Sequence, residues 1–447
     1  MQNYQTTGVP RGPENDRKKT ITITTWHMLA ILAVSTTMVV GQEVGTTGLS
    51  IPLEQMLQAN REVRAAEQVY QAAQARIGTI GLPDPMLENT SFLQAVETRN
   101  GPMENQIMLG QKFPLWGKLK RQKLIAGQKA EIARTMLDQK RVQVAFQMRS
   151  AWENIVTLER SLAILINYRD ELESFKTIAL TQYSTGSGLT QHPVLKLQIE
   201  ISLTESRINE LQGDLAAAVH TLQQLFDGSY TPDLFAGQRT TVPTEQLDDY
   251  WLDIARENNP RYRKARAEVE VASLDHQLAK RKSYPDLTTG LTYTAIGTSD
   301  NAIAPESGAD ALGVKLGLNI PIWFGKNKSA SRATKLTQNA RQDQLLAVWN
   351  QIEDNVRSVV DALAEIEETY DLYSSRLISE SEQMLASAYS AYETGKISFL
   401  DVLDSQRMVV RVRLEFESVE QKRRIASAKL LMNVGLIDLE EVANNEG

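Results

Sequence analysis

The chain of 447 residues contains no cysteine, which excludes a disulfide framework, a thiol nucleophile and a lipid-modified N-terminal cysteine. Aromatic residues make up only 6% of it, and the formal net charge of −7 gives no indication of a nucleic-acid partner. Proline and glycine are missing from long tracts, where Gln, Ala, Leu and Glu are abundant. This composition favours long helices.

Long apolar runs are also scarce, and the one near the N-terminus has the form of a secretory signal. A basic cluster at residues 17–19 precedes an apolar core at residues 28–40, and the small residue Gly41 follows. Signal peptides have this order of regions, so we expect residues 1–41 to be one. An N-terminal anchor helix is the alternative, although the core is shorter than the roughly 20 residues that span a bilayer. A membrane protein with this sequence would therefore cross by strands.

Four segments have the pattern of strands. In the last one, Val314, Leu316, Leu318 and Ile320 alternate with Lys, Gly and Asn. One apolar and one polar face is typical of a strand between lipid and water, although a half-buried hairpin on a soluble core has the same pattern. The predicted strands form two hairpins and cover residues 86–97, 104–114, 287–296 and 311–321.

Four strands cannot close a membrane barrel, which needs about eight or more. The barrel hypothesis therefore requires oligomerisation. Two chains would supply about eight strands and three chains about twelve, and the strand pattern does not choose between them.

Two tracts of roughly 65 residues, beginning near residues 115 and 323, would each form a helix about 100 Å long. In the second tract, apolar residues from Leu345 to Leu377 follow alternating spacings of four and three, which indicates a coiled-coil seam. In the first tract Arg169 interrupts a similar seam. Breakers at Gly186 and Gly395 would fold each long helix back on a shorter partner, giving two antiparallel helical hairpins.

The same order of segments occurs twice. Pro321 follows Pro114 by 207 residues, and Gly395 follows Gly186 by 209. Nearly constant offsets indicate an internal duplication. We therefore predict a first repeat at residues 42–243 and a second at 244–447. The first repeat comprises a helix, a β-hairpin at 86–114, a helical hairpin at 115–226 and a linker at 227–243. The second repeat comprises helices, a β-hairpin at 287–321, a helical hairpin at 323–434 and a C-terminal tail.

Each predicted strand pair joins its long helix through a similar segment, FPLWGK in the first half and IPIWFGK in the second. Proline ends a strand because it cannot donate to the ladder, tryptophan collects at membrane–water boundaries, and glycine permits a sharp turn. Helix-start packing of the two tryptophans is the alternative. The second joint carries one extra residue, Phe324. We assign the membrane-interface joints to Pro114, Trp116, Gly117, Pro321, Trp323 and Gly325, with nearby lysines facing headgroups or water.

These joints, together with GLPDPML (residues 81–87) and YETGKISFLDVLDSQ (residues 392–406), resemble the outer membrane factors, the TolC-like family of efflux and secretion exit ducts. The resemblance covers residues 51–436 and is greatest to members that serve heavy-metal or drug pumps of the RND class. It implies a mixed α and β membrane protein. Three chains would form a 12-stranded outer-membrane barrel, which continues into a periplasmic α-helical barrel built from the long hairpins.

The resemblance also implies a gate and docking tips. Asp401 and Asp404, an i, i+3 pair that shares one helix face, would narrow the periplasmic entrance with Tyr392, although Ile397 stands where the family has an arginine. His192 stands where relatives have an acidic residue, and we expect it to be a surface residue rather than a metal ligand. The tips that would receive a periplasmic adaptor contain Tyr183, Gly186, Gly188, Gly395 and Lys396.

We therefore expect a trimeric exit duct that works with a periplasmic adaptor and an inner-membrane pump, without a cofactor, a metal site or enzyme activity. The sequence contains no HExxH, P-loop or GxSxG motif. Two alternatives remain: the exit duct of a type I protein secretion system, and a periplasmic coiled-coil scaffold without a pore. A scaffold would not use an apolar strand face in lipid.

Overall fold

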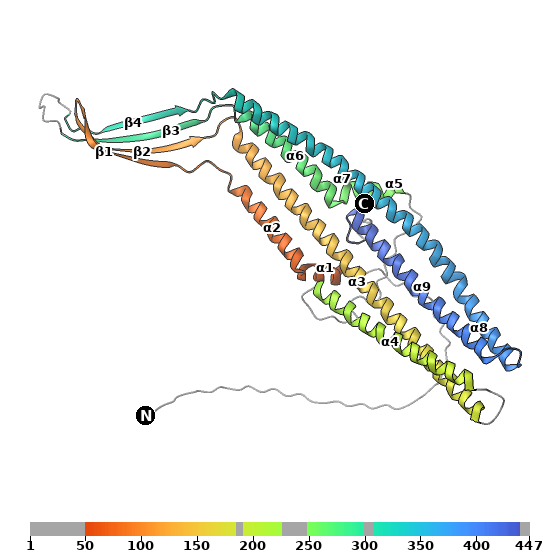
Figure 1. Ribbon diagram of the computed structural model, residues 1–447. Helices are drawn as coiled ribbons and strands as arrows, with labels where there is room; N and C mark the ends of the chain where they lie inside the picture. The colour runs from red at the N-terminus through yellow and green to blue at the C-terminus, as the bar shows by residue number, and fades with distance from the viewer. Residues whose placement is uncertain (1–49, 185–190, 226–247, 299–306, 439–447) are drawn as a thin grey trace, which may run out of the picture. The chain divides into compact units, whose positions relative to one another are not determined.

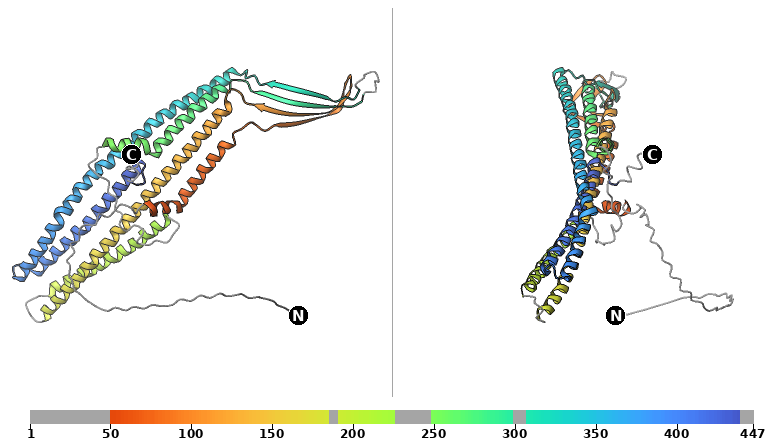
Figure 2. Two further views of the ribbon diagram at one scale, coloured as in Figure 1. Left: turned by 180° about the vertical axis from the view of Figure 1, so that it is seen from behind. Right: turned by 90° about the vertical axis from the view of Figure 1, so that its right-hand side faces the viewer.

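The computed structural model describes residues 50–184, 191–225, 248–298 and 307–438. These residues form a four-stranded antiparallel sheet and a set of long helices (Figures 1 and 2). The predicted signal peptide and the linker at 227–243 lie outside them. No helix in the described ranges is long and apolar enough to cross a membrane.

The sheet has the order β1-β2-β3-β4, so its centre joins the two halves of the sequence. The strands β2 and β3, which are far apart in the chain, pair from Phe113 opposite Leu287 to Met103 opposite Ile296. The bounds of β3 coincide with the predicted strand, whereas β4 ends three residues earlier than predicted. The strands are β1 (Met86–Thr98), β2 (Gly101–Phe113), β3 (Leu287–Ile296) and β4 (Ala311–Leu318).

Four helices adjoin the sheet, and the remaining helices pack lower along them (Figure 1). In the first half the long α3 contacts α2, α4, α6 and α9, and in the second half α7 contacts α6 and α9. The helices beside the sheet are α2 (Arg61–Gly78), α3 (Lys118–Ser184), α6 (Pro260–Arg281) and α7 (Phe324–Leu372). The others are α1 (Ser50–Ala59), α4 (Gln191–Leu225), α5 (Asp248–Asn258), α8 (Ile378–Glu393) and α9 (Phe399–Val434).

The predicted single helix before the first strand is two helices, because Asn60 breaks it. Its Oδ1 accepts hydrogen bonds from the backbone N–H groups of Glu62 and Val63, which makes it the N-cap of α2. Its amide Nδ2 donates to the carbonyl of Leu225, 2.6 Å away, at the end of α4. One buried side chain thus satisfies the start of one helix and the end of another.

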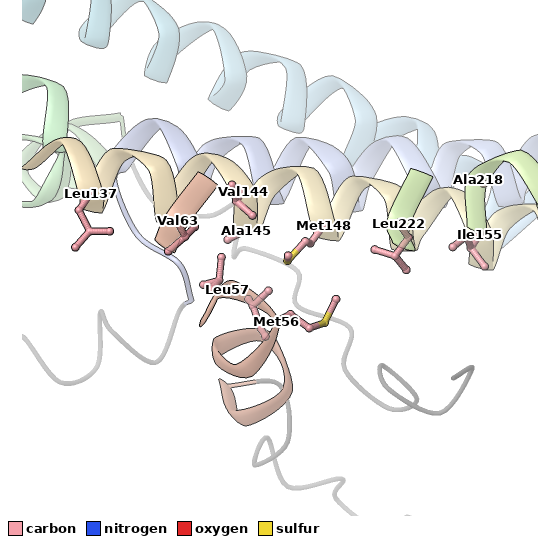
Figure 3. Packing of buried hydrophobic residues seen from close by; sticks show 11 residues of the cluster. Met56, Leu57, Val63, Leu137, Val144, Ala145, Met148, Ile155, Ala218 and Leu222 are labelled. Carbon is pink, nitrogen blue, oxygen red and sulfur yellow. The ribbon is translucent and has the colours of Figure 1, made fainter. Parts of the chain in front are cut away.

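Asn259 makes the same connections in the second half. It is the N-cap of α6, and its Nδ2 donates to the carbonyl of Asn433 over 2.6 Å, near the end of α9. Each half also has a short helix on its core. Leu53, Met56 and Leu57 of α1 pack on α3 and α4 (Figure 3), and Trp251, Leu252 and Ala255 of α5 pack with α7 and α9.

The predicted seam of the second long helix is buried at Ile352, Val356, Val359 and Leu363. In the first long helix Tyr168, next to Arg169, is buried and continues the apolar line. We predicted one continuous α-helix for the second long tract, and this is wrong. A π-helical turn, η2 (Tyr373–Leu377), separates α7 from α8. Such turns insert one residue into the helix and change which side chains face the partner.

Candidate functional site

One face of the sheet is apolar and exposed across all four strands. The backbone register places Leu87, Leu109, Leu291 and Val314 side by side, and all four are exposed. In the next row along the strands, Ile107, Tyr293 and Leu312 continue the apolar face on β2 to β4, and Asn89 stands beside Ile107 on β1. A contiguous exposed apolar face of this kind is unusual on a soluble monomer and indicates a surface that meets lipid or another protein.

The opposite face of the sheet carries polar and small side chains. Gln106 donates from Nε2 to Oγ1 of Thr294 over 3.4 Å, and Thr288 stands opposite Gly317. At Gly290 an added Cβ would lie 3.2 Å from the carbonyl oxygen of Leu109, so the strands approach closely there. Side chains along the strands therefore alternate between a mainly apolar face and a mainly polar face, as the sequence pattern predicted.

The sheet has two unpaired edges among the described residues. The strand β1 pairs only with β2, and β4 pairs only with β3. Their outer backbone groups can pair with a further strand, so the sheet can be extended on both sides.

The first joint makes a turn through two residues with positive φ. Trp116 has φ 63° and Gly117 has φ 70°. A non-glycine residue seldom adopts this conformation, and here contacts hold the tryptophan in place. The indole packs on Tyr284, with ring centroids 5.3 Å apart, and its Nε1 donates to the carbonyl of Pro285 over 3.0 Å. The ring remains half exposed, consistent with both the boundary and the packing interpretations.

Lys118 corrects one sequence expectation. We predicted that the lysines near the joints would face headgroups or water, but Lys118, the first of them after Trp116, is only 7% exposed. Its Nζ lies 2.6 Å from Oδ1 of Asp286 and 2.7 Å from the carbonyl oxygen of Tyr284. Burial alone would raise the pKa of Asp286, but hydrogen bonds and charge attraction from Lys118 and Lys112 outweigh it and hold that pKa below its ordinary value. This ion pair ties the first joint to the start of β3.

The second joint differs from the first, which corrects a second expectation. Gly325 was predicted to permit the turn, but α7 already begins at Phe324, and Gly325 lies in its first turn. Positive φ occurs at Gly117 and not at Gly325. The extra residue Phe324 accounts for the difference in position. Trp323 and Phe324 are both largely exposed, at 71% and 78%.

The second tip closes with a glycine turn. Gly395 has φ 70°, and the N–H of Lys396 donates to the carbonyl of Ala391 over 2.9 Å. These features form a Schellman motif, which requires glycine at the left-handed position. Lys396 and, on the first hairpin, Tyr183 are exposed. Gly186 and Gly188 lie outside the described residues.

The two predicted gate aspartates have different environments. Oδ2 of Asp401 accepts hydrogen bonds from the N–H and hydroxyl of Ser398, at 2.8 and 2.7 Å, so Asp401 caps the start of α9. These hydrogen bonds hold its pKa below the ordinary value. Asp404 lies 3.2 Å from a guanidinium nitrogen of Arg407 and 3.8 Å from Nζ of Lys196 on α4. Both carboxylates are exposed.

Tyr392, the predicted gate tyrosine, packs within the chain. Its ring centroid is 5.8 Å from that of Phe399, which also contacts Phe175 of α3 at 5.7 Å. The side chain is half-buried. His192 is exposed near the start of α4, and Ile397 is half-buried.

Sequence reasoning missed a polar cluster between the helical hairpins. Tyr168 donates from Oη to Glu200 over 3.0 Å, and Arg407 of α9 donates to the other oxygen of Glu200. Burial favours a raised pKa for Glu200, but the hydrogen bonds from Arg407 and Tyr168 lower it overall. Because the three residues come from α3, α4 and α9, only the pairing of the hairpins brings them together. The one sequence signal was Tyr168 beside the interrupted seam.

Residues 251–435 match the family model of the outer membrane efflux protein. The predicted resemblance to this family is confirmed. The match also supports the predicted efflux function.

Two efflux proteins are similar to most of the chain. The cobalt-zinc-cadmium resistance protein CzcC of Cupriavidus metallidurans is 22% identical over 348 residues, which cover 77% of this chain and 78% of CzcC. The cation efflux system protein CusC of Escherichia coli K12 is 26% identical over 326 residues, covering 70% and 67% respectively. A crystal structure of CusC superimposes with a TM-score of 0.69 at 16% identity, over 90% of this chain and 96% of that one. The chain therefore has the fold of a solved outer-membrane channel protein.

Proposed function

We propose that three copies of the chain form an outer-membrane exit duct for an efflux system. The exposed apolar face that continues in register across β1 to β4 carries this proposal. Three copies would give twelve strands, with the apolar face toward lipid and the polar face lining the pore. Residues 1–41 would direct export, and residues 42–243 and 244–447 would be the two structural repeats.

The helices support the same assembly. One face of α4 carries an apolar stripe that the single chain does not cover, because Leu195, Ile199 and Leu203 are exposed at four-residue spacing. Neighbouring copies would cover it and close the helices into a periplasmic tunnel. The joints would lie at the inner membrane boundary, with the tips at the far end of the tunnel.

The partners would meet the tips. We propose that a periplasmic adaptor docks around Tyr183, Gly186, Gly188, Gly395 and Lys396, and that an inner-membrane pump of the RND class delivers the cargo. The gate would comprise Asp401, Asp404 and Tyr392. Because CzcC is named for cobalt, zinc and cadmium resistance and CusC for cation efflux, metal cations are the cargo class to test first.

The experiment is reconstitution of the purified protein. Native mass spectrometry of the detergent-extracted chain is expected to show three copies, and planar bilayers are expected to show ion conductance. A monomer without conductance would contradict the proposal and favour the scaffold. If the protein conducts but its deletion leaves cation resistance of the host unchanged while a secreted protein is retained, the duct belongs to protein secretion.

A further inference from the structure

A surface cavity lies beside the first joint, at the β1 edge of the sheet. It has a volume of about 570 Å³ and lies where the end of α2 meets the start of α3. Its floor is apolar, and two lysines stand at its rim. The lining residues are Ile80, Gly81, Leu82, Leu119, Lys120, Lys123 and Leu124.

The opposite edge of the sheet carries exposed apolar side chains at the same level. Ile322, Trp323 and Phe324 follow β4 and are 58%, 71% and 78% exposed. Phe324 has no equivalent in the first joint, where Gly117 follows Trp116 directly. Most of its ring therefore stands clear of the described chain. An aromatic side chain of this size stabilises a contact chiefly when it is buried.

The order of the elements brings these two features together between copies. The helix α2 leads into β1 at one edge of the sheet, and β4 leads into α7 at the other (Figure 1). If β4 of one copy pairs with β1 of the next, the residues after β4 lie beside the residues before β1. The joint with Phe324 then faces the cavity at Ile80–Leu82 of the neighbouring copy.

We infer that Phe324 of one copy inserts into the Ile80–Leu124 cavity of the adjacent copy and fixes the contact between them just below the sheet. This inference rests on the proposed trimer and names the residues that hold it. The apolar floor formed by Leu82, Leu119 and Leu124 matches a phenyl ring. Lys120 and Lys123 have long flexible stems, so their charged ends can turn to water or headgroups while the floor stays accessible.

The absence of cysteine allows a direct test by cross-linking. A Cβ added at Gly81 or Gly325 would meet no described atom within 4 Å, so Gly81→Cys and Gly325→Cys should leave Leu82 and Phe324 in place. A short thiol-to-thiol cross-linker is expected to join the double variant into covalent dimers and trimers. The matched control pairs Gly325→Cys with Gly213→Cys on α4, which also has free space and lies far from the joint.

The role of the Phe324 ring is tested by replacing it. Phe324→Ala is expected to raise the apparent dissociation constant of the assembly at least about tenfold, because a buried aromatic side chain is lost, whereas Phe324→Leu should retain most of the contact. Since Phe324 is largely exposed in the single chain, neither change should alter its helical content by circular dichroism.

The outcomes separate this inference from the proposed function. A conducting trimer that gives no Gly81–Gly325 cross-link, or whose assembly is unchanged by Phe324→Ala, would overturn the inference and leave the duct intact. Copurification of one phospholipid per chain, lost on replacing Lys120 and Lys123 with Glu, would assign the cavity to lipid and would also overturn it. A chain that remains monomeric and does not conduct would refute both.

Discussion

At the scale of single residues, two asparagines cap helices in the same way in the two halves of the chain. Asn60 and Asn259 each begin a helix with a side-chain oxygen and close another helix with a side-chain amide. Both are almost fully buried, so each loss would leave backbone donors and a carbonyl without partners. The shared arrangement supports the predicted repeat more directly than the sequence offsets do.

Replacing either asparagine with alanine is expected to destabilise its region by roughly 1–3 kcal/mol, since a cap and a buried hydrogen bond are lost together. Hydrogen exchange should show the loss of protection at the start of α2 for Asn60→Ala and at the start of α6 for Asn259→Ala. Gln58→Ala, on an exposed position of α1, is the control and should leave protection unchanged. Equal effects of all three variants would refute the role of the caps.

The ion pair below the sheet gives stability a defined dependence on pH. The pKa of Asp286 is lower in the folded chain than in the unfolded chain, so the unfolded state binds more protons as the pH falls. The stabilisation is therefore fully present above the ordinary aspartate pKa of about 3.9 and is lost progressively as the pH falls from there through the lower pKa of the folded chain.

Asp286→Asn is expected to reduce stability at pH 7 by an amount near the lower end of the roughly 3–5 kcal/mol seen when a buried pair is broken. Thermal unfolding followed by circular dichroism should show this difference at pH 7 and a smaller difference near pH 3. The exposed Asp84→Asn serves as the control. A difference that persists unchanged at pH 3 would show that the charge of Asp286 is not its source.

At the scale of elements, hydrophobic periodicity and helix-breaking residues predicted the strands and the long helices. The alternation around Val314 placed β4, and the spacing from Ile352 to Leu363 placed the seam of α7. The break at Asn60 was missed because an asparagine within a helical pattern can also be a surface residue. The cluster of Tyr168, Glu200 and Arg407 depends on contacts between hairpins, which local patterns do not encode.

The π-helical turn η2 interrupts the regular hydrogen-bond ladder of the long helix that contains it. We expect the amides of Tyr373–Leu377 to exchange faster than those of neighbouring turns in α7 and α8. The matched control is residues 164–168 of α3, which occupy the corresponding place in the first half and are α-helical. Hydrogen-exchange mass spectrometry resolves both segments, and equal protection would argue against a weak point.

At the scale of the whole molecule, the proposed pore should respond to charge at its entrance. Asp404→Asn is expected to weaken block by multivalent cations in planar bilayers, since carboxylates around a narrow pore attract cations. It is also expected to raise conductance, because the ion pairs of Asp404 with Arg407 and Lys196 would no longer hold the proposed entrance narrow. Asp401→Asn should add to the effect but also weaken the start of α9, because Asp401 caps that helix. Asp214→Asn, exposed on α4 away from the tip, is the control. Unchanged conductance and block in Asp404→Asn would refute the gate assignment.

The two edges of the sheet have a consequence for how many copies assemble. Each copy contributes four described strands, and its first and last strands run in opposite directions. Any number of copies can therefore be joined edge to edge with antiparallel pairing throughout. Strand pairing alone therefore does not set the number of copies. In the proposed duct, the angle between the helices of neighbouring copies would set that number. The circumference of the barrel would then follow from the packing of the helical tunnel.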